Sequence, residues 1–339
     1  MPPMNLLRLC SLTLATLAAV MAAEPAPAVI TKLNDKGEPG TAFEEAFVVN
    51  ETVDGLEFLV EDPKEGNKLT LKRGSYRIEY NRTKDIDFLR GEGQDDPAKA
   101  AAFYEKAVAA NRFQWAKEDG LVALARLNLT RKQYDAAIAA ADQLAKEAPR
   151  SVRLDDILAI KGQAQQAKGD TAGAKATYTA LSGMAKEWGP ESAIQGTLGA
   201  ANLLAEEKKF AEAAALVEPL LNDKLDDAQF GTLALGVAQY HQAAGKLDAA
   251  LAILAKVAYA PGTAAAEAHL RWARILADQP GSVAEAFDHA AIAATLKGAP
   301  GPVTDQARLL IRTLVDKLQK DPALTEAQKL EYRQCRDNL

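Results

Sequence analysis

A five-residue pattern with alanine at its fourth position recurs along the chain and constrains its fold more than any other feature. The first copy begins at Pro97 and the last at Val283. A fixed period of this size is typical of a solenoid, in which each unit buries its apolar face only against its neighbours. The sequence therefore predicts a helical repeat array over residues 97–298. The aligned alanines are Ala100, Ala137, Ala174, Ala213, Ala250 and Ala286, which lie 37, 37, 39, 37 and 36 residues apart.

Each unit is predicted to be a hairpin of two helices joined by a tight turn. Asp170 and Ser282 stand where the side chain of a helix N-cap is expected. The recurring alanine has a steric role, because a side chain without bulk lets the second helix approach its partner closely. The predicted hairpins cover residues 121–147, 157–186, 192–221, 230–258 and 264–296. Two further helices, at 304–319 and 325–336, are predicted to cap the array within residues 299–339.

This unit resembles the tetratricopeptide repeat (TPR), although its period exceeds the usual 34 residues by two to five. The resemblance implies a stack of hairpins whose first helices line a concave face on which ligands lie. Three kinds of position match the family: an aromatic or apolar residue opening the second helix, a bulky residue later in it, and small or terminating residues around it. The matching residues are Tyr134, Phe210 and Leu247 for the first kind, Tyr104 and Tyr178 for the second, and Gly162, Pro149 and Pro261 for the third.

The resemblance directs attention to polar residues at corresponding places on successive first helices. A row of amides can hydrogen-bond both the N–H and the C=O groups of an extended peptide. The row therefore predicts a binding site for a protein or an extended peptide, and the alternative interpretation is a solvated polar groove without a partner. The row consists of Arg126, Gln163, Asn202 and Gln239, with Gln166 and Gln242 one helical turn later.

Residues 24–82 predict a different kind of module. Short runs of branched and aromatic residues alternate with Gly-, Asn- and Asp-rich turns, which indicates five β-strands. The pattern is similar to small Sm-like barrels, in which closure removes unpaired strand edges. The alanine content of the chain rises sharply after residue 96: residues 24–96 hold four alanines, and residues 97–339 hold 60. We therefore expect residues 83–96 to form a linker between an all-β module and a mainly α solenoid.

The charge of the chain is concentrated in the β module and the linker. Residues 24–96 carry 17 acidic and 10 basic side chains, a net charge of −7, whereas residues 97–339 carry 29 of each. This acidity could attract a basic partner or simply keep a solvated surface soluble. A sequence pI near 5.4 argues against nucleic-acid binding, which needs a basic face.

The first 23 residues predict a secretory signal peptide. One positive charge precedes an apolar run that ends in small residues at Val20-Met21-Ala22, and the run is too short to span a membrane. Cys10 as a lipid-attachment site is the alternative, but Arg8 and Leu9 precede it where small residues are needed. We expect an exported protein, periplasmic or extracellular, without a membrane segment after cleavage.

The sequence offers little that predicts catalysis. His241, His269 and His289 lack the spacing of metal ligands and are expected to be half-exposed helix residues. No nucleophile elbow, phosphate loop or dinucleotide fingerprint is present, so we expect no catalytic residue, cofactor or metal.

These observations favour an exported, non-enzymatic interaction scaffold. The alternative is a cell-envelope enzyme or accessory factor that acts on peptidoglycan or another envelope polymer. A third interpretation is self-assembly through the open ends of the solenoid.

Overall fold

The computed structural model describes residues 23–222, 225–260 and 263–339. Residues 1–22 of the predicted signal peptide, with Cys10, and the matched proline Pro261 lie outside these ranges. The chain divides into two compact units, which we describe separately. Unit 1 comprises Met1–Leu127 and Leu144–Arg153, and unit 2 comprises Asn128–Gln143 and Leu154–Leu339.

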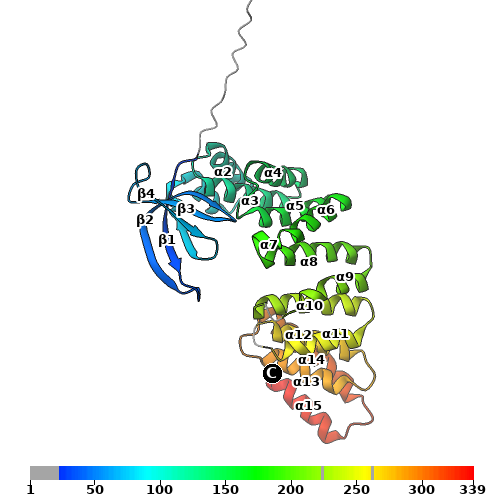
Figure 1. The fold of residues 1–339 in the computed structure, drawn as a ribbon. Helices are drawn as coiled ribbons and strands as arrows, with labels where there is room; N and C mark the ends of the chain where they lie inside the picture. The colour runs from blue at the N-terminus through cyan, green and yellow to red at the C-terminus, as the bar shows by residue number, and fades with distance from the viewer. Residues whose placement is uncertain (1–22, 223–224, 261–262) are drawn as a thin grey trace, which may run out of the picture. The chain divides into compact units, whose positions relative to one another are not determined.

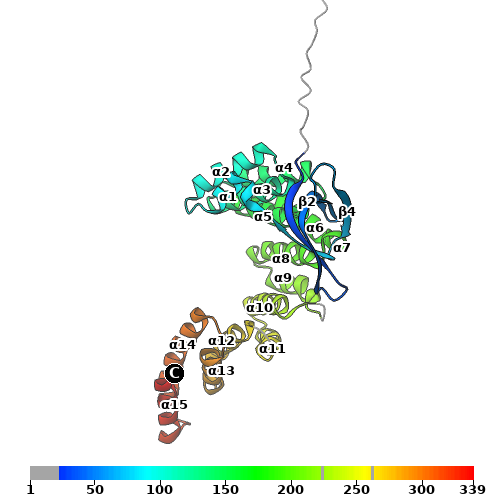
Figure 2. The ribbon, with the colours of Figure 1, turned by 90° about the vertical axis from the view of Figure 1, so that its left-hand side faces the viewer.

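Unit 1 opens with the five predicted strands, which form one antiparallel sheet in the order β4-β3-β2-β1-β5 (Figure 1). Register shifts along β1 and β2 are consistent with the curved sheet of Figure 2, because a bulge bends its strand. No strand pair joins β4 to β5 in the part of the chain described, so closure into a barrel stays a prediction. The strands are β1 (Ala26–Leu33), β2 (Pro39–Thr52), β3 (Gly55–Val60), β4 (Asn67–Lys72) and β5 (Tyr76–Tyr80).

Residues 83–96, which we expected to be a linker, contain most of the 3₁₀ helix η1 (Arg82–Lys84) and all of α1 (Ile86–Glu92). The next helices are α2 (Pro97–Ala110) and α3 (Gln114–Thr130). A Cβ added at Gly91 of α1 would lie 2.8 Å from the Tyr104 ring of α2, so the two helices pack closely. Helix α1 therefore packs against α2, the helix that carries the first copy of the repeated pattern, as the first helix of a hairpin would.

Trp115 at the start of α3 is the centre of an aromatic cluster in unit 1. Its ring centroid lies 5.4 Å from that of Tyr80 in β5, 5.0 Å from that of Phe88 in α1 and 6.3 Å from that of Phe113. Phe88, Phe113 and Trp115 are all buried. The cluster therefore joins the sheet to the helices of unit 1 through a few large side chains.

The remaining helices confirm the predicted mainly α, TPR-like architecture. Helices α2, α4, α6, α9, α11 and α13 each begin at the first residue of the repeated pattern, so every aligned alanine is the fourth residue of its helix. All six of these alanines are at most 3% exposed. The elements are α4 (Tyr134–Glu147), α5 (Leu154–Lys168), α6 (Thr171–Gly183), α7 (Ala185–Trp188), α8 (Pro190–Glu206), α9 (Phe210–Val217), η2 (Glu218–Leu220), α10 (Asp227–Ala243), α11 (Leu247–Ala258), α12 (Ala264–Ala277), α13 (Val283–Thr295), α14 (Gly301–Gln319) and α15 (Glu326–Asn338).

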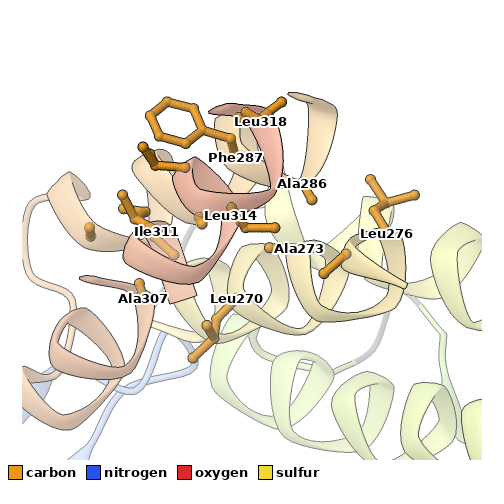
Figure 3. Close-up of a cluster of buried hydrophobic side chains, with 14 residues drawn as sticks. Leu270, Ala273, Leu276, Ala286, Phe287, Ala307, Ile311, Leu314 and Leu318 are labelled. Carbon is orange, nitrogen blue, oxygen red and sulfur yellow. The ribbon is translucent and has the colours of Figure 1, made fainter. Parts of the chain in front are cut away.

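Alanines line the contacts between helices at the end of unit 2. Figure 3 shows Ala273 of α12, Ala286 of α13 and Ala307 of α14 among larger side chains such as Leu270 and Leu314. These three alanines are fully buried. Because alanine adds little bulk, neighbouring helices can pack at close range while the leucines fill the space around them.

Tyr178 of α6 shows how glycine contributes to the same packing. A Cβ added at Gly162 of α5 would lie 2.4 Å from the Tyr178 ring, and one added at Gly199 of α8 would lie 2.3 Å from it. The ring therefore occupies a notch between two first helices, and the match of Gly162 and Tyr178 to the repeat pattern corresponds to a real contact.

One of the two predicted helix N-caps is present. The Asp170 carboxylate accepts a hydrogen bond of 2.9 Å from the Gly173 N–H. The prediction for Ser282 is wrong: its φ of −103° and ψ of 7° are not the extended backbone of most N-caps, and its side chain makes no capping hydrogen bond.

Candidate functional site

The predicted polar row lies on successive first helices and is almost entirely exposed. Arg126 is on α3 in unit 1 and is exposed there. The other five residues belong to unit 2, and of these only Gln166 is half-buried. They are Gln163 and Gln166 on α5, Asn202 on α8, and Gln239 and Gln242 on α10.

Side-chain hydrogen bonds join the first helices of unit 2 to one another. Gln166 Nε2 on α5 donates to Glu206 Oε1 on α8 at 2.7 Å. The Tyr240 hydroxyl on α10 donates to Asn202 Oδ1 on α8 at 2.6 Å. Helices α5, α8 and α10 are therefore neighbours joined by direct hydrogen bonds. We call the exposed side of these three helices, together with that of α12, the first-helix face.

Two amides of the row already serve these contacts. Gln166 also accepts a hydrogen bond of 3.2 Å from the Tyr178 hydroxyl, so both ends of its amide are used. Asn202 uses its carbonyl oxygen and keeps its NH₂ group. Gln163, Gln239 and Gln242 form no side-chain hydrogen bond with the residues described, so they are the amides that a ligand could engage.

The structure adds Arg271 and Arg274 of α12 to the first-helix face. Arg271 Nη1 donates to the Leu235 carbonyl of α10 at 3.0 Å, and Arg274 Nη2 donates to Gln306 Oε1 of α14 at 2.6 Å. Both arginines lie on the side of α12 that faces solvent, since Arg274 is exposed and Arg271 is partly so. Arg271 Nε also pairs with Glu267 Oε1 of the same helix at 2.7 Å, so the positive charge that α12 adds to the face comes from Arg274.

Sequence counting missed these arginines because the spacing that relates the other members of the row does not hold at α12. Gln239 precedes Ala250 by eleven residues, and the same step back from Ala286 leads to Ile275, which is 4% exposed. Residues 278–282 separate α12 from α13, whereas only residues 244–246 separate α10 from α11. Allowing for the two extra turn residues leads to Ala273, which is fully buried, so turn length alone does not locate the arginines.

The prediction that the three histidines are half-exposed is wrong, because helix packing buries all of them. His269 Nδ1 on α12 lies 2.8 Å from His289 Nδ1 on α13. Burial lowers the pKa of both imidazoles; the charge of His289 lowers that of His269 further, while a hydrogen bond to the Ala258 backbone opposes the shift. Among the residues described, no group of three or more His, Cys, Asp or Glu side chains is arranged to hold a metal.

A cavity of about 320 Å³ lies in unit 1 between the sheet and the ends of α3 and α4. Glu118 lies in its wall, and burial raises the pKa of this carboxyl. Gln114 Nε2 and Ser151 Oγ donate to its two oxygens at 2.8 and 2.7 Å, and Lys117 pairs with Glu147 at 2.7 Å. Glu118, Lys117 and Glu147 therefore all have partners within the protein, as expected of a structural joint.

Comparisons with known proteins add a likeness to solved structures. No protein family and no curated protein matches the chain. Among solved structures, the chain is similar to a tetratricopeptide repeat protein from Parabacteroides merdae ATCC 43184, with a TM-score of 0.31 and 16% identity, over 68% of this chain and 97% of that one. Our assignment of the fold rests on the hairpins of the chain itself. In the part described, no helix combines the length and the apolar character needed to cross a membrane.

Proposed function

We propose that the chain is an exported, non-enzymatic scaffold that binds an extended segment of a partner protein on its first-helix face. The observation that carries the proposal is the set of unengaged amides on α5 and α10, with the Asn202 NH₂ group on α8 between them. Each amide offers a donor and an acceptor, which suits the alternating N–H and C=O groups of an extended backbone.

The spacing of the helices sets the length of the segment. Neighbouring packed helices lie about 8–10 Å apart, so the path from α5 across α8 to α10 is on the order of 20 Å. An extended chain rises about 3.3 Å per residue, and roughly six residues would cover this path. Beyond α10, the exposed Arg274 favours a segment that carries an acidic residue at that end.

Site-specific photocrosslinking in the native host tests the binding face. Crosslinkers at Gln163 and Gln239 are expected to capture the same partner, which mass spectrometry identifies. A crosslinker at Ala252, an exposed residue of the second helix α11, is the matched control and should capture much less of it. Equal capture at all three positions, or none at Gln163 and Gln239, would contradict the proposal.

The remaining parts of the proposal need separate measurements. Export predicts that the purified native protein begins near Glu24, which N-terminal mass spectrometry determines. Release of soluble fragments from peptidoglycan by the purified chain would contradict the non-enzymatic role and favour an envelope enzyme.

A further inference from the structure

A second cavity of unit 1, of about 330 Å³, differs from the one beside Glu118 because it combines an apolar wall with unpaired positive charge. Its apolar wall consists of Pro25, Pro27, Phe47, Pro63 and Phe113. Phe113 is 2% exposed, and the other four are half-buried. The wall draws on the start of β1, on β2, on the loop after β3 and on the loop between α2 and α3, so it is formed only in the folded unit.

Three cationic side chains surround this wall, namely Lys64, Lys84 and Arg112, and Glu24 is the one acidic residue among them. Neither lysine ammonium forms a hydrogen bond or an ion pair with the residues described. Both lysines are exposed at the margin of the cavity. Three positive side chains and one negative side chain therefore border the apolar wall.

Arg112 is held in position by its neighbours. Its Nη1 donates to the Lys84 carbonyl at 2.9 Å, its Nε donates to Glu24 Oε2 at 3.3 Å, and its guanidinium carbon lies 4.9 Å from the Phe113 ring centroid. A guanidinium has five N–H donors, so these two hydrogen bonds leave three donors for another acceptor. Such a fixed group loses little conformational entropy when it binds an anion.

The surroundings make this concentration of positive charge informative. Residues 24–96 carry a net charge of −7, yet the cavity that they form with Arg112 and Phe113 is positive. Three of its nine lining residues are prolines, which have no backbone N–H to donate. An anion held here would therefore depend on the two lysines and the arginine.

We infer that this cavity binds an apolar carboxylate, whose carboxylate contacts Lys64, Lys84 and Arg112 while its apolar part lies against Phe47, Phe113 and the prolines. The volume is at the small end of ligand pockets, which run from about 300 to 1,000 Å³. It suits a short acyl chain or one apolar residue at the carboxyl end of a peptide. Both sources present the same chemistry to the cavity.

Calorimetric titration of the full chain with matched pairs of probes tests the inference. The first pair is octanoate and octanamide; the second is N-acetyl-Gly-Ser-Gly-Leu with a free carboxylate and as the carboxamide. We expect at least one acid to bind. Its amide should bind at least about tenfold more weakly, because the amide loses charge-assisted hydrogen bonds. The acid that binds identifies the source. Inorganic phosphate should bind far more weakly, because it has no apolar part.

Paired variants locate the binding. The double variant Lys64→Gln and Lys84→Gln should weaken binding of the acid about tenfold, since each substitution removes a positive charge. Lys36→Gln, at an exposed lysine of the β1–β2 turn, is the matched control and should change binding less than twofold. The inference is overturned if neither acid binds, if acid and amide bind equally, if phosphate binds as tightly, or if the double variant binds like the control. Variants of Gln163 and Gln239 should leave this binding unchanged, which separates it from the proposed scaffold function.

Discussion

The two units of the chain reach a packed interior by opposite means. Unit 1 concentrates its packing in large rings around Trp115, which contacts Tyr80, Phe88 and Phe113. Unit 2 distributes its packing over small residues that recur from hairpin to hairpin, such as Ala213, Ala250 and Ala286, all fully buried. In unit 1 each large contact occurs once, whereas in unit 2 one contact is repeated, so single substitutions should act differently in the two units.

Unit 1 also contains a partly buried set of ion pairs beside its aromatic cluster. In unit 1, Arg153 Nε donates to Asp119 Oδ1 at 2.6 Å, and Arg82 Nη2 lies 3.6 Å from Asp119 Oδ2. Burial would lower the pKa of Arg153, but the Asp119 carboxylate outweighs it and raises that pKa. Arg82 also lies over the Trp115 ring, with its guanidinium carbon 5.8 Å from the ring centroid. The ion pairs and the aromatic cluster therefore support each other.

The largest effect is expected at the centre of the aromatic cluster. Trp115→Ala removes an almost fully buried ring and should destabilise unit 1 by about 3–5 kcal/mol. Chemical denaturation measures the loss, and hydrogen exchange should place it in peptides of the sheet, α1 and α3. Trp115→Phe keeps an aromatic ring and should cost clearly less. A loss spread evenly over both units would contradict the contrast between them.

An added side chain in an alanine seam should produce the next largest effect. Ala250→Leu or Ala213→Leu would overpack a fully buried helix contact and cost about 1–3 kcal/mol. The control is Ala252→Leu, because Ala252 is exposed on the same helix as Ala250. Unchanged melting temperatures for both seam variants would mean that the alanines do not set the distance between the helices.

Acid should weaken unit 2 through its histidine pair. Burial lowers the pKa of His269 and of His289 in the folded state. As the pH falls through about 6.5, the unfolded imidazoles take up protons that the folded ones do not, so stability is lost on acidification. The free energy of unfolding should therefore be lower at pH 6 than at pH 8. Denaturation at several pH values gives the free energy of unfolding of the unmodified chain and of the double variant His269→Gln and His289→Gln. The unmodified chain should lose more of it between pH 8 and pH 6 than the double variant, and parallel pH profiles would refute the assignment.

The repeat could be predicted from sequence because a single residue type marks its register. The alanine period located the starts of α4, α9, α11 and α13, and the predicted start of α6 was one residue late. Helix α1 was missed because it is only seven residues long and lies in an alanine-poor segment. The His269–His289 contact and the cavity of Lys64, Lys84 and Arg112 were not predictable, because tertiary packing unites residues that are distant in sequence.

The smallest predicted effect tests whether glycine in unit 2 is needed for packing or merely tolerated. Gly162→Ala places a methyl group 2.4 Å from the Tyr178 ring, and the ring must move. We expect a net loss of about 1 kcal/mol, since the strain exceeds the gain in helix propensity. Gly236 in α10 has no atom within 4 Å of an added Cβ, so Gly236→Ala should instead stabilise by about 0.5–1 kcal/mol. Thermal unfolding of both variants measures the difference in sign, and a stabilising Gly162→Ala would show that the notch around Tyr178 has room to spare.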